Sequence, residues 1–138
     1  MKNYLEHISL NVSNPEKSFP FYKDLFLFLD YKIIRDNKEC LAVRKEGTAD
    51  FWIKATKTEY LLNSFHRKNT GLNHLAFMVE SKQEVDRFYN EFLKVKNIKT
   101  LYESPKFFPK YTNDYYAVFF EDPDRIKIEI LNSTFNSK

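Results

Sequence analysis

Apolar and polar residues alternate along several short segments of the chain, which is the pattern of strands with one buried face. Two longer stretches instead place apolar residues at helical spacing. The first begins at Pro15, after the capping residue Asn14, and ends near Phe28; the second follows Ser81 and ends near Val95. The expected strands are Leu5–Val12, Tyr31–Arg35, Cys40–Arg44, Asp50–Ala55, Leu72–Val79, Ile98–Glu103 and a closing pair within Tyr115–Leu131.

The pattern of the first half recurs in the second half of the chain. His7 recurs as His74, Val12 as Val79 and Tyr22 as Tyr89, always 67 positions later. Such a constant offset indicates an internal repeat. We therefore predict an α+β fold of two βαβββ modules, with curved mixed sheets that enclose a cleft and helices outside. Module one takes residues 1 to about 56, a connector follows to about 70, module two runs from about 71 to 132, and 133–138 form a polar tail.

Composition narrows the class of protein. Hydrophobic residues make up 43% and aromatic residues 17% of the 138 residues, as in a globular domain. The net charge of +3 is spread along the chain without a run of like charges, so we expect no nucleic-acid partner. A single cysteine, Cys40, rules out a disulfide within the chain. Neither a membrane span nor a signal peptide is indicated, and we expect a soluble cytoplasmic protein without a membrane partner.

Three side chains form the candidate chemistry. His7 and His74 occupy equivalent repeat positions on the strand face opposite the apolar one, and Glu129 follows the same rule because Ile128 and Ile130 take the core face. Two imidazoles and a carboxylate with open positions suit a divalent transition metal such as Mn, Fe, Co, Ni or Zn. Solvent is the other explanation, since a strand with one wet face often carries Glu or His. His66, in the connector, has no repeat partner.

Several motifs together resemble the vicinal oxygen chelate superfamily, which includes glyoxalase I, fosfomycin-resistance thiol transferases, extradiol dioxygenases and metal-free bleomycin-binding proteins. The motifs are HISLNV at His7, FYKDL at Phe21, NHLAF at Asn73 and the closing strand pair with its Asp122–Asp124 turn. They span nearly the whole chain, and so imply a single glyoxalase-like domain over residues 1–138. The resemblance implies that His7, His74 and Glu129 are metal ligands. It also implies a homodimer that acts on a small-molecule substrate.

Two positions depart from the pattern of that superfamily. Trp52 occupies the position where glyoxalase I carries a fourth ligand, with Asp50 two residues away. Indole cannot bind a metal, so the remaining set resembles the three-ligand pattern of thiol transferases and dioxygenases. The usual glycine after Asp-Pro-Asp is Arg125 here, which costs on the order of 1 kcal/mol if the turn needs a positive φ.

Aromatic residues around the predicted cleft favour an apolar or planar ligand, although they can equally pack the loop or a dimer interface. Lys54 and Lys127 on the cleft face can receive an anionic group or remain solvated. We predict a metal-dependent lyase, isomerase or thiol transferase, with a metal-free ligand-sequestering protein as the alternative and a ring-cleaving Fe(II) dioxygenase third. The substrate-pocket candidates are Trp52, Tyr102, Phe108 and Tyr115.

Overall fold

A computed structural model describes residues 1 and 3–134; residues 135–138 of the predicted polar tail lie outside the described part. The chain divides into two compact units, Met1–Ser64 and Phe65–Lys138, and each contains one four-stranded mixed sheet. The boundary falls within the connector, which contains the 3₁₀ helix η1 at Thr58–Tyr60. The predicted α+β class with two βαβββ modules is confirmed.

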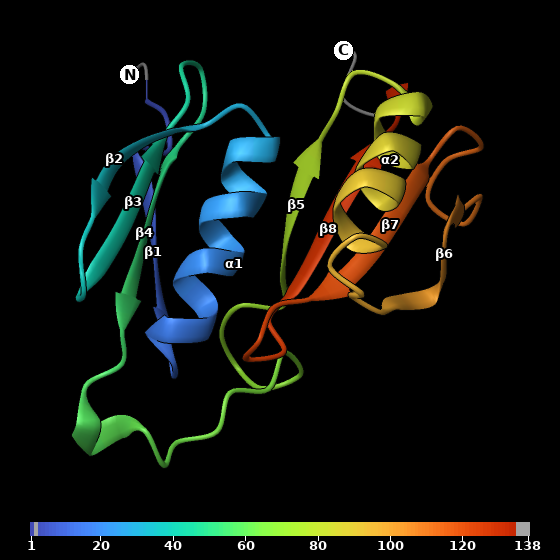
Figure 1. Ribbon diagram of the computed structural model, residues 1–138. Coiled ribbons are helices and arrows are strands. Elements are labelled where there is room, and N and C mark those ends of the chain that lie inside the picture. The colour runs from blue at the N-terminus through green and yellow to red at the C-terminus, as the bar shows by residue number, and fades with distance from the viewer. Residues whose placement is uncertain (2, 135–138) are drawn as a thin grey trace. The chain divides into compact units, whose positions relative to one another are not determined.

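The first unit has the sheet order β1-β4-β3-β2, with β1 parallel to β4 and the other pairs antiparallel. Its helix α1 contacts β2, β3 and β4 on one face (Figure 1). Phe26 of α1 packs on Phe51 of β4, with ring centroids 4.8 Å apart. The elements are β1 (His7–Val12), α1 (Pro15–Phe28), β2 (Lys32–Asp36), β3 (Cys40–Arg44) and β4 (Asp50–Ala55).

The second unit repeats this topology in the order β5-β8-β7-β6, with β5 parallel to β8 (Figure 1). Helix α2 contacts β7 and β8, and the alternate residues Ile126, Ile128 and Ile130 are buried as expected. Its elements are β5 (His74–Met78), α2 (Lys82–Phe88), η2 (Tyr89–Leu93), β6 (Thr100–Phe107), β7 (Tyr116–Glu121) and β8 (Lys127–Asn132). Among the described residues, no helix combines the length and apolar character that crossing a bilayer requires.

Two element ends differ from the sequence prediction by more than two residues. The second helix was expected to run to Val95, but α2 ends at Phe88 and the chain continues as the π-helical turn η2. Ser81 does cap α2, since its Oγ accepts a hydrogen bond from the Glu84 backbone N at 3.2 Å. Strand β6 extends to Phe107, beyond its predicted end at Glu103.

The extension of β6 depends on Ser104. The register of β6 against β7 shifts between Leu101 and Lys106, and Tyr102 has a φ of 59° there. The buried Ser104 hydroxyl accepts from the Phe119 backbone N at 2.9 Å and donates to the Leu101 carbonyl at 2.7 Å. This side chain replaces ladder hydrogen bonds across the bulge, which lets the strand resume beyond it.

The turn between β7 and β8 adopts a positive φ at the position expected to favour glycine. Arg125 has a φ of 66°. The Asp122 Oδ1 stabilises the turn by accepting from the backbone N of Asp124 at 2.8 Å and of Ile126 at 2.7 Å. The backbone strain expected from a non-glycine residue is therefore present, and a side-chain-capped turn holds it.

Candidate functional site

Glu129 is buried within the second unit. It lies on the face of β8 opposite helix α2 and is only 2% exposed. The alternative that this carboxylate is simply solvated on a wet strand face is therefore wrong. The register pairs Ala76 of β5 with Glu129, which places His74 diagonally across on the same face. The His74 Nε2 and Glu129 Oε2 atoms lie 3.3 Å apart. The structure thus brings two of the three predicted ligands together.

The partner of His74 Nδ1 indicates the tautomer of the ring. Nδ1 lies 2.7 Å from the Asn73 Oδ1, which accepts hydrogen bonds, so Nδ1 carries the proton. In the neutral ring Nε2 then presents a lone pair to a carboxylate oxygen. Two acceptors at this distance repel unless a proton or a metal cation lies between them.

Burial sets the protonation of both groups. Desolvation first, and then the positive charge of Lys127, lower the pKa of His74 below its ordinary 6.5. Burial also raises the pKa of Glu129 above its ordinary 4.5, although a hydrogen bond from Tyr115 and the charge of Lys127 oppose the rise. The imidazole is therefore neutral at pH 7, as a metal ligand must be, while protons compete for the carboxylate.

Tyr115 fixes the orientation of the carboxylate. Its hydroxyl donates to the Glu129 Oε1 at 2.7 Å, and burial together with this bond raises the pKa of Tyr115. The adjacent Asp114 anchors the loop that carries Tyr115: its carboxylate accepts from the Thr112 Oγ1 at 2.8 Å and from the Thr134 backbone N at 2.6 Å. These bonds lower the pKa of Asp114. The second oxygen of the Glu129 carboxylate, Oε2, faces His74.

His74 and Glu129 line a pocket of about 850 Å³ within the second unit. Three of the four predicted pocket residues, Tyr102, Phe108 and Tyr115, also line it. Phe108 is 8% exposed and packs with Ala117, Phe119 and Leu131, so the packing explanation holds for this ring as well. The aromatic lining consists of Tyr102, Phe107, Phe108, Tyr111, Tyr115 and Phe119.

Phe119 also lines the pocket, but it was not among the predicted pocket residues, although its place could be inferred from the sequence. Its position on β7 is the register partner of Glu129, and its ring lies 6.5 Å from the imidazole of His74. Pairing the two closing strands across the turn at Asp122 would have placed it beside the carboxylate. Alternation along a strand predicts which face each residue takes, whereas the neighbour across the sheet depends on the cross-strand register.

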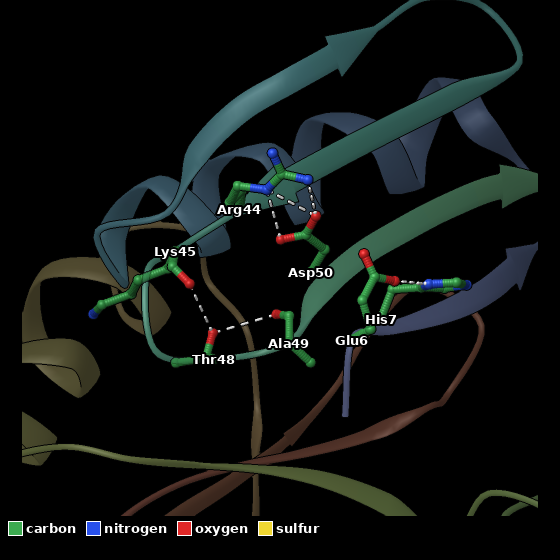
Figure 2. Close-up of polar contacts among 7 residues, drawn as sticks. All are labelled: Glu6, His7, Arg44, Lys45, Thr48, Ala49 and Asp50. Atoms are coloured by element: carbon green, nitrogen blue, oxygen red, sulfur yellow. Dashed lines mark hydrogen bonds and ion pairs between the residues drawn. The ribbon is translucent and has the colours of Figure 1, made fainter. Parts of the chain in front are cut away.

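His7 lies on β1 of the first unit and is exposed. Its Nδ1 contacts the Glu6 carboxylate (Figure 2). Asn73 likewise contacts the Nδ1 of His74, so the preceding residue holds Nδ1 in both histidines of the repeat. Asp50, the register partner of His7, is 5% exposed and receives a bidentate contact from Arg44, with the shortest distance 2.6 Å (Figure 2). Within either unit, the described residues contain no group of three His, Cys, Asp or Glu side chains that could hold a metal ion.

Trp52 faces away from the helix of the first unit, as expected. Phe51 and Ile53 are buried on the helix side, whereas Trp52 is half-buried on the opposite face. The Arg35 guanidinium lies 5.5 Å from the centre of the indole ring. A cation–π contact therefore accounts for part of its environment. Its substrate-binding role stays a prediction.

The repeated modules, together with a His–Glu pair in an aromatic pocket, define a protein of the vicinal oxygen chelate type. A sequence model of the Glyoxalase/Bleomycin resistance protein/Dioxygenase superfamily matches residues 4–130, and the chain belongs to this superfamily. The chain is 37% identical over 127 residues to the uncharacterized protein YqjT of Bacillus subtilis (strain 168), covering 92% of this chain and 97% of YqjT.

Solved structures agree with this assignment. A candidate glyoxalase from Bacillus halodurans superposes with a TM-score of 0.84 at 36% identity, covering 94% of this chain and 95% of that one. The fosfomycin resistance protein FosX from Listeria monocytogenes has a TM-score of 0.69 at 23% identity, over 99% and 98% of the two chains. A lactoylglutathione lyase from Agrobacterium tumefaciens has a TM-score of 0.66 at 14% identity, over 96% and 95%. The last two likenesses show the fold alone.

Proposed function

We propose that the protein is a metal-dependent enzyme that acts on a small molecule with neighbouring oxygens, as a lyase, an isomerase or a thiol transferase. His7, His74 and Glu129 are the proposed ligands of a divalent Mn, Fe, Co, Ni or Zn ion. Superfamily members commonly use divalent metals and act on small molecules. The homodimer and the cytoplasmic location stay predictions.

The observation that carries the proposal is the pairing of His74 with Glu129. Ligands bound to one ion at 2.0–2.2 Å lie about 3.0–3.5 Å apart, which matches the 3.3 Å between Nε2 and Oε2. Each repeat histidine has its Nδ1 held by the preceding side chain, Glu6 or Asn73, as metal-ligating histidines generally do. The donor set therefore fits a transition metal.

The residues of the second unit prepare this site for chemistry. Asn73 fixes the tautomer that directs the His74 Nε2 lone pair toward Glu129, and Tyr115 holds the carboxylate in one orientation. The aromatic walls of the pocket present apolar surfaces that orient an apolar substrate body. When bound, a divalent metal supplies a Lewis acid for substrate oxygens.

Calorimetric titration of Mn²⁺ and Zn²⁺ into chelator-treated protein tests the metal site. We expect binding by the wild type, at least tenfold weaker binding by His74→Ala, and unchanged binding by the matched control His66→Ala. His66 is an exposed residue of the connector region, and its Nδ1 accepts from the Lys68 backbone N. Equal affinity in all three proteins would exclude His74 as a ligand.

The second candidate function is metal-free sequestration of an aromatic ligand. The six-ring lining of the pocket favours it. A sequestering protein would bind such a ligand equally well with chelator and with metal, and would convert no substrate in lyase or thiol-transfer assays. Turnover that depends on added metal and disappears in His74→Ala would support the enzyme instead.

A further inference from the structure

The charge around the second-unit pocket is asymmetric. Of the described residues that line it, three are lysines, Lys106, Lys110 and Lys127, and one, Glu129, carries a carboxylate. Neither Lys110 nor Lys127 forms an ion pair with any residue of the described part of the chain. Within the part of the chain that the structure describes, the ion-pair partner of Lys106 is Glu103, at 4.0 Å, and the side chain of Glu103 is 96% exposed. Among the described residues of the lining, the three positive charges therefore exceed the one negative charge of Glu129.

Lys127 has the most defined position of the three. It is the β-sheet register partner of His74, and it shares a face of β8 with Glu129, two residues away. Its ammonium lies 5.6 Å from the ring centres of both Tyr102 and Phe119. The charge is thus placed where the aromatic walls meet the His74–Glu129 pair.

The aromatic walls form a continuous apolar surface around this charge. Phe119 packs edge-on against Tyr102 and Phe108, with ring centroids 5.3 and 5.2 Å away. Tyr111 packs on Tyr115 with centroids 4.9 Å apart. Rings held by one another present fixed flat surfaces, which favour a planar apolar ligand over a flexible polar one.

We propose that this pocket selects a planar, apolar molecule that carries one carboxylate, and that Lys127 is the specificity-determining cation. This names the substrate class of the site under the proposed function and rests on it. The carboxylate contacts the Lys127 ammonium, and the apolar body lies against Tyr102 and Phe119. Because the lysine is half-buried beside aromatic rings, its attraction for an anion is less screened than that of a fully solvated lysine.

Two probes of equal shape test the selection: 2-naphthoate, which is an anion, and 2-naphthamide, which is neutral. Affinities are measured by calorimetry with the full chain, once in chelator and once with Mn²⁺. In chelator we expect the wild type to bind the naphthoate about tenfold more tightly than the amide. Lys127→Met should lose this preference, and Lys127→Arg, which keeps the charge, should retain most of it.

The matched control is Lys99→Met, which removes an exposed lysine of the same unit that does not line the pocket. It should keep the full preference. Equal affinity of the wild type for both probes, binding of neither probe, or an unchanged preference in Lys127→Met would each overturn the proposal. The chelator arm separates this result from the metal site: a preference that persists without any metal binding would refute the proposed enzyme and leave the ligand class standing.

Discussion

Removing the Tyr115 hydroxyl tests how the buried carboxylate is held. Tyr115→Phe deletes one oxygen, the donor to the Glu129 Oε1 at 2.7 Å, and keeps the ring that packs on Tyr111. A hydrogen bond to a charged acceptor contributes about 1.5–3 kcal/mol. Because Tyr115 is half-buried, we expect the lower part of this range, a loss of about 1.5–2 kcal/mol in the free energy of unfolding.

The same change should weaken metal binding through protonation and orientation of the carboxylate. The Tyr115 hydrogen bond lowers the pKa of Glu129, so without it that pKa rises further and protons compete more strongly. Metal affinity at pH 7 is expected to fall about 10–100-fold, and the pH at which metal loading is half complete should move upward.

Urea unfolding measures the change in stability, and Mn²⁺ titration measures the change in metal affinity. Both are performed between roughly pH 5 and pH 8, where protonation of Glu129 and His74 competes with metal binding. The matched control is Tyr89→Phe, because the Tyr89 hydroxyl forms no hydrogen bond with any described residue. Its stability should change by less than about 0.5 kcal/mol. A Tyr115→Phe protein with wild-type metal affinity at every pH would refute the positioning role, even if its stability dropped.

Three other substitutions test separate parts of the account. Since burial raises the pKa of Glu129, the metal-free wild type should lose stability as pH rises above about 4.5. Glu129→Gln should abolish metal binding and should flatten this loss of stability in urea titrations. An unchanged dependence of stability on pH in Glu129→Gln would contradict the assigned effect of Glu129. Arg44→Met removes the bidentate partner of the buried Asp50 and should lower the free energy of unfolding more than Lys23→Met, which breaks an exposed ion pair and should cost under about 0.5 kcal/mol. Equal losses in the two variants would contradict a stabilising role for the Arg44–Asp50 pair. Ser81→Ala should lower the unfolding free energy by about 1 kcal/mol, and no change would argue against the cap.

Much of the fold was predictable from the sequence because local rules determine it. Alternation located strands β3 and β4 at their observed bounds, and Pro15 marked the first turn of α1. The repeat of His7 as His74 revealed the two modules. The face of each candidate residue also followed from alternation alone, as the positions of Trp52 and Glu129 show.

The structural details that the sequence did not predict depend on interactions between residues far apart along the chain. Glu129 is buried because Tyr115, Phe119 and other side chains from neighbouring segments surround it, and no alternation rule on β8 reports this. Likewise, β6 continues through its bulge because the Ser104 hydroxyl binds the backbone of β7. The ion pair between Asp50 and Arg44 could be predicted only from the register of β3 against β4. Cross-strand partners, rather than residue order, determined these outcomes.

The metal content of the purified protein tests directly whether His74 helps to hold a divalent ion. Protein purified without chelator, and then incubated with Mn²⁺, Fe²⁺, Ni²⁺ or Zn²⁺ and desalted, is analysed by mass spectrometry beside His74→Ala and the His66→Ala control. We expect close to one metal ion per chain in the wild type and in His66→Ala, and almost none in His74→Ala. A wild type that retains no metal under any of these conditions, or a His74→Ala protein that retains as much as the wild type, would contradict the proposed metal site.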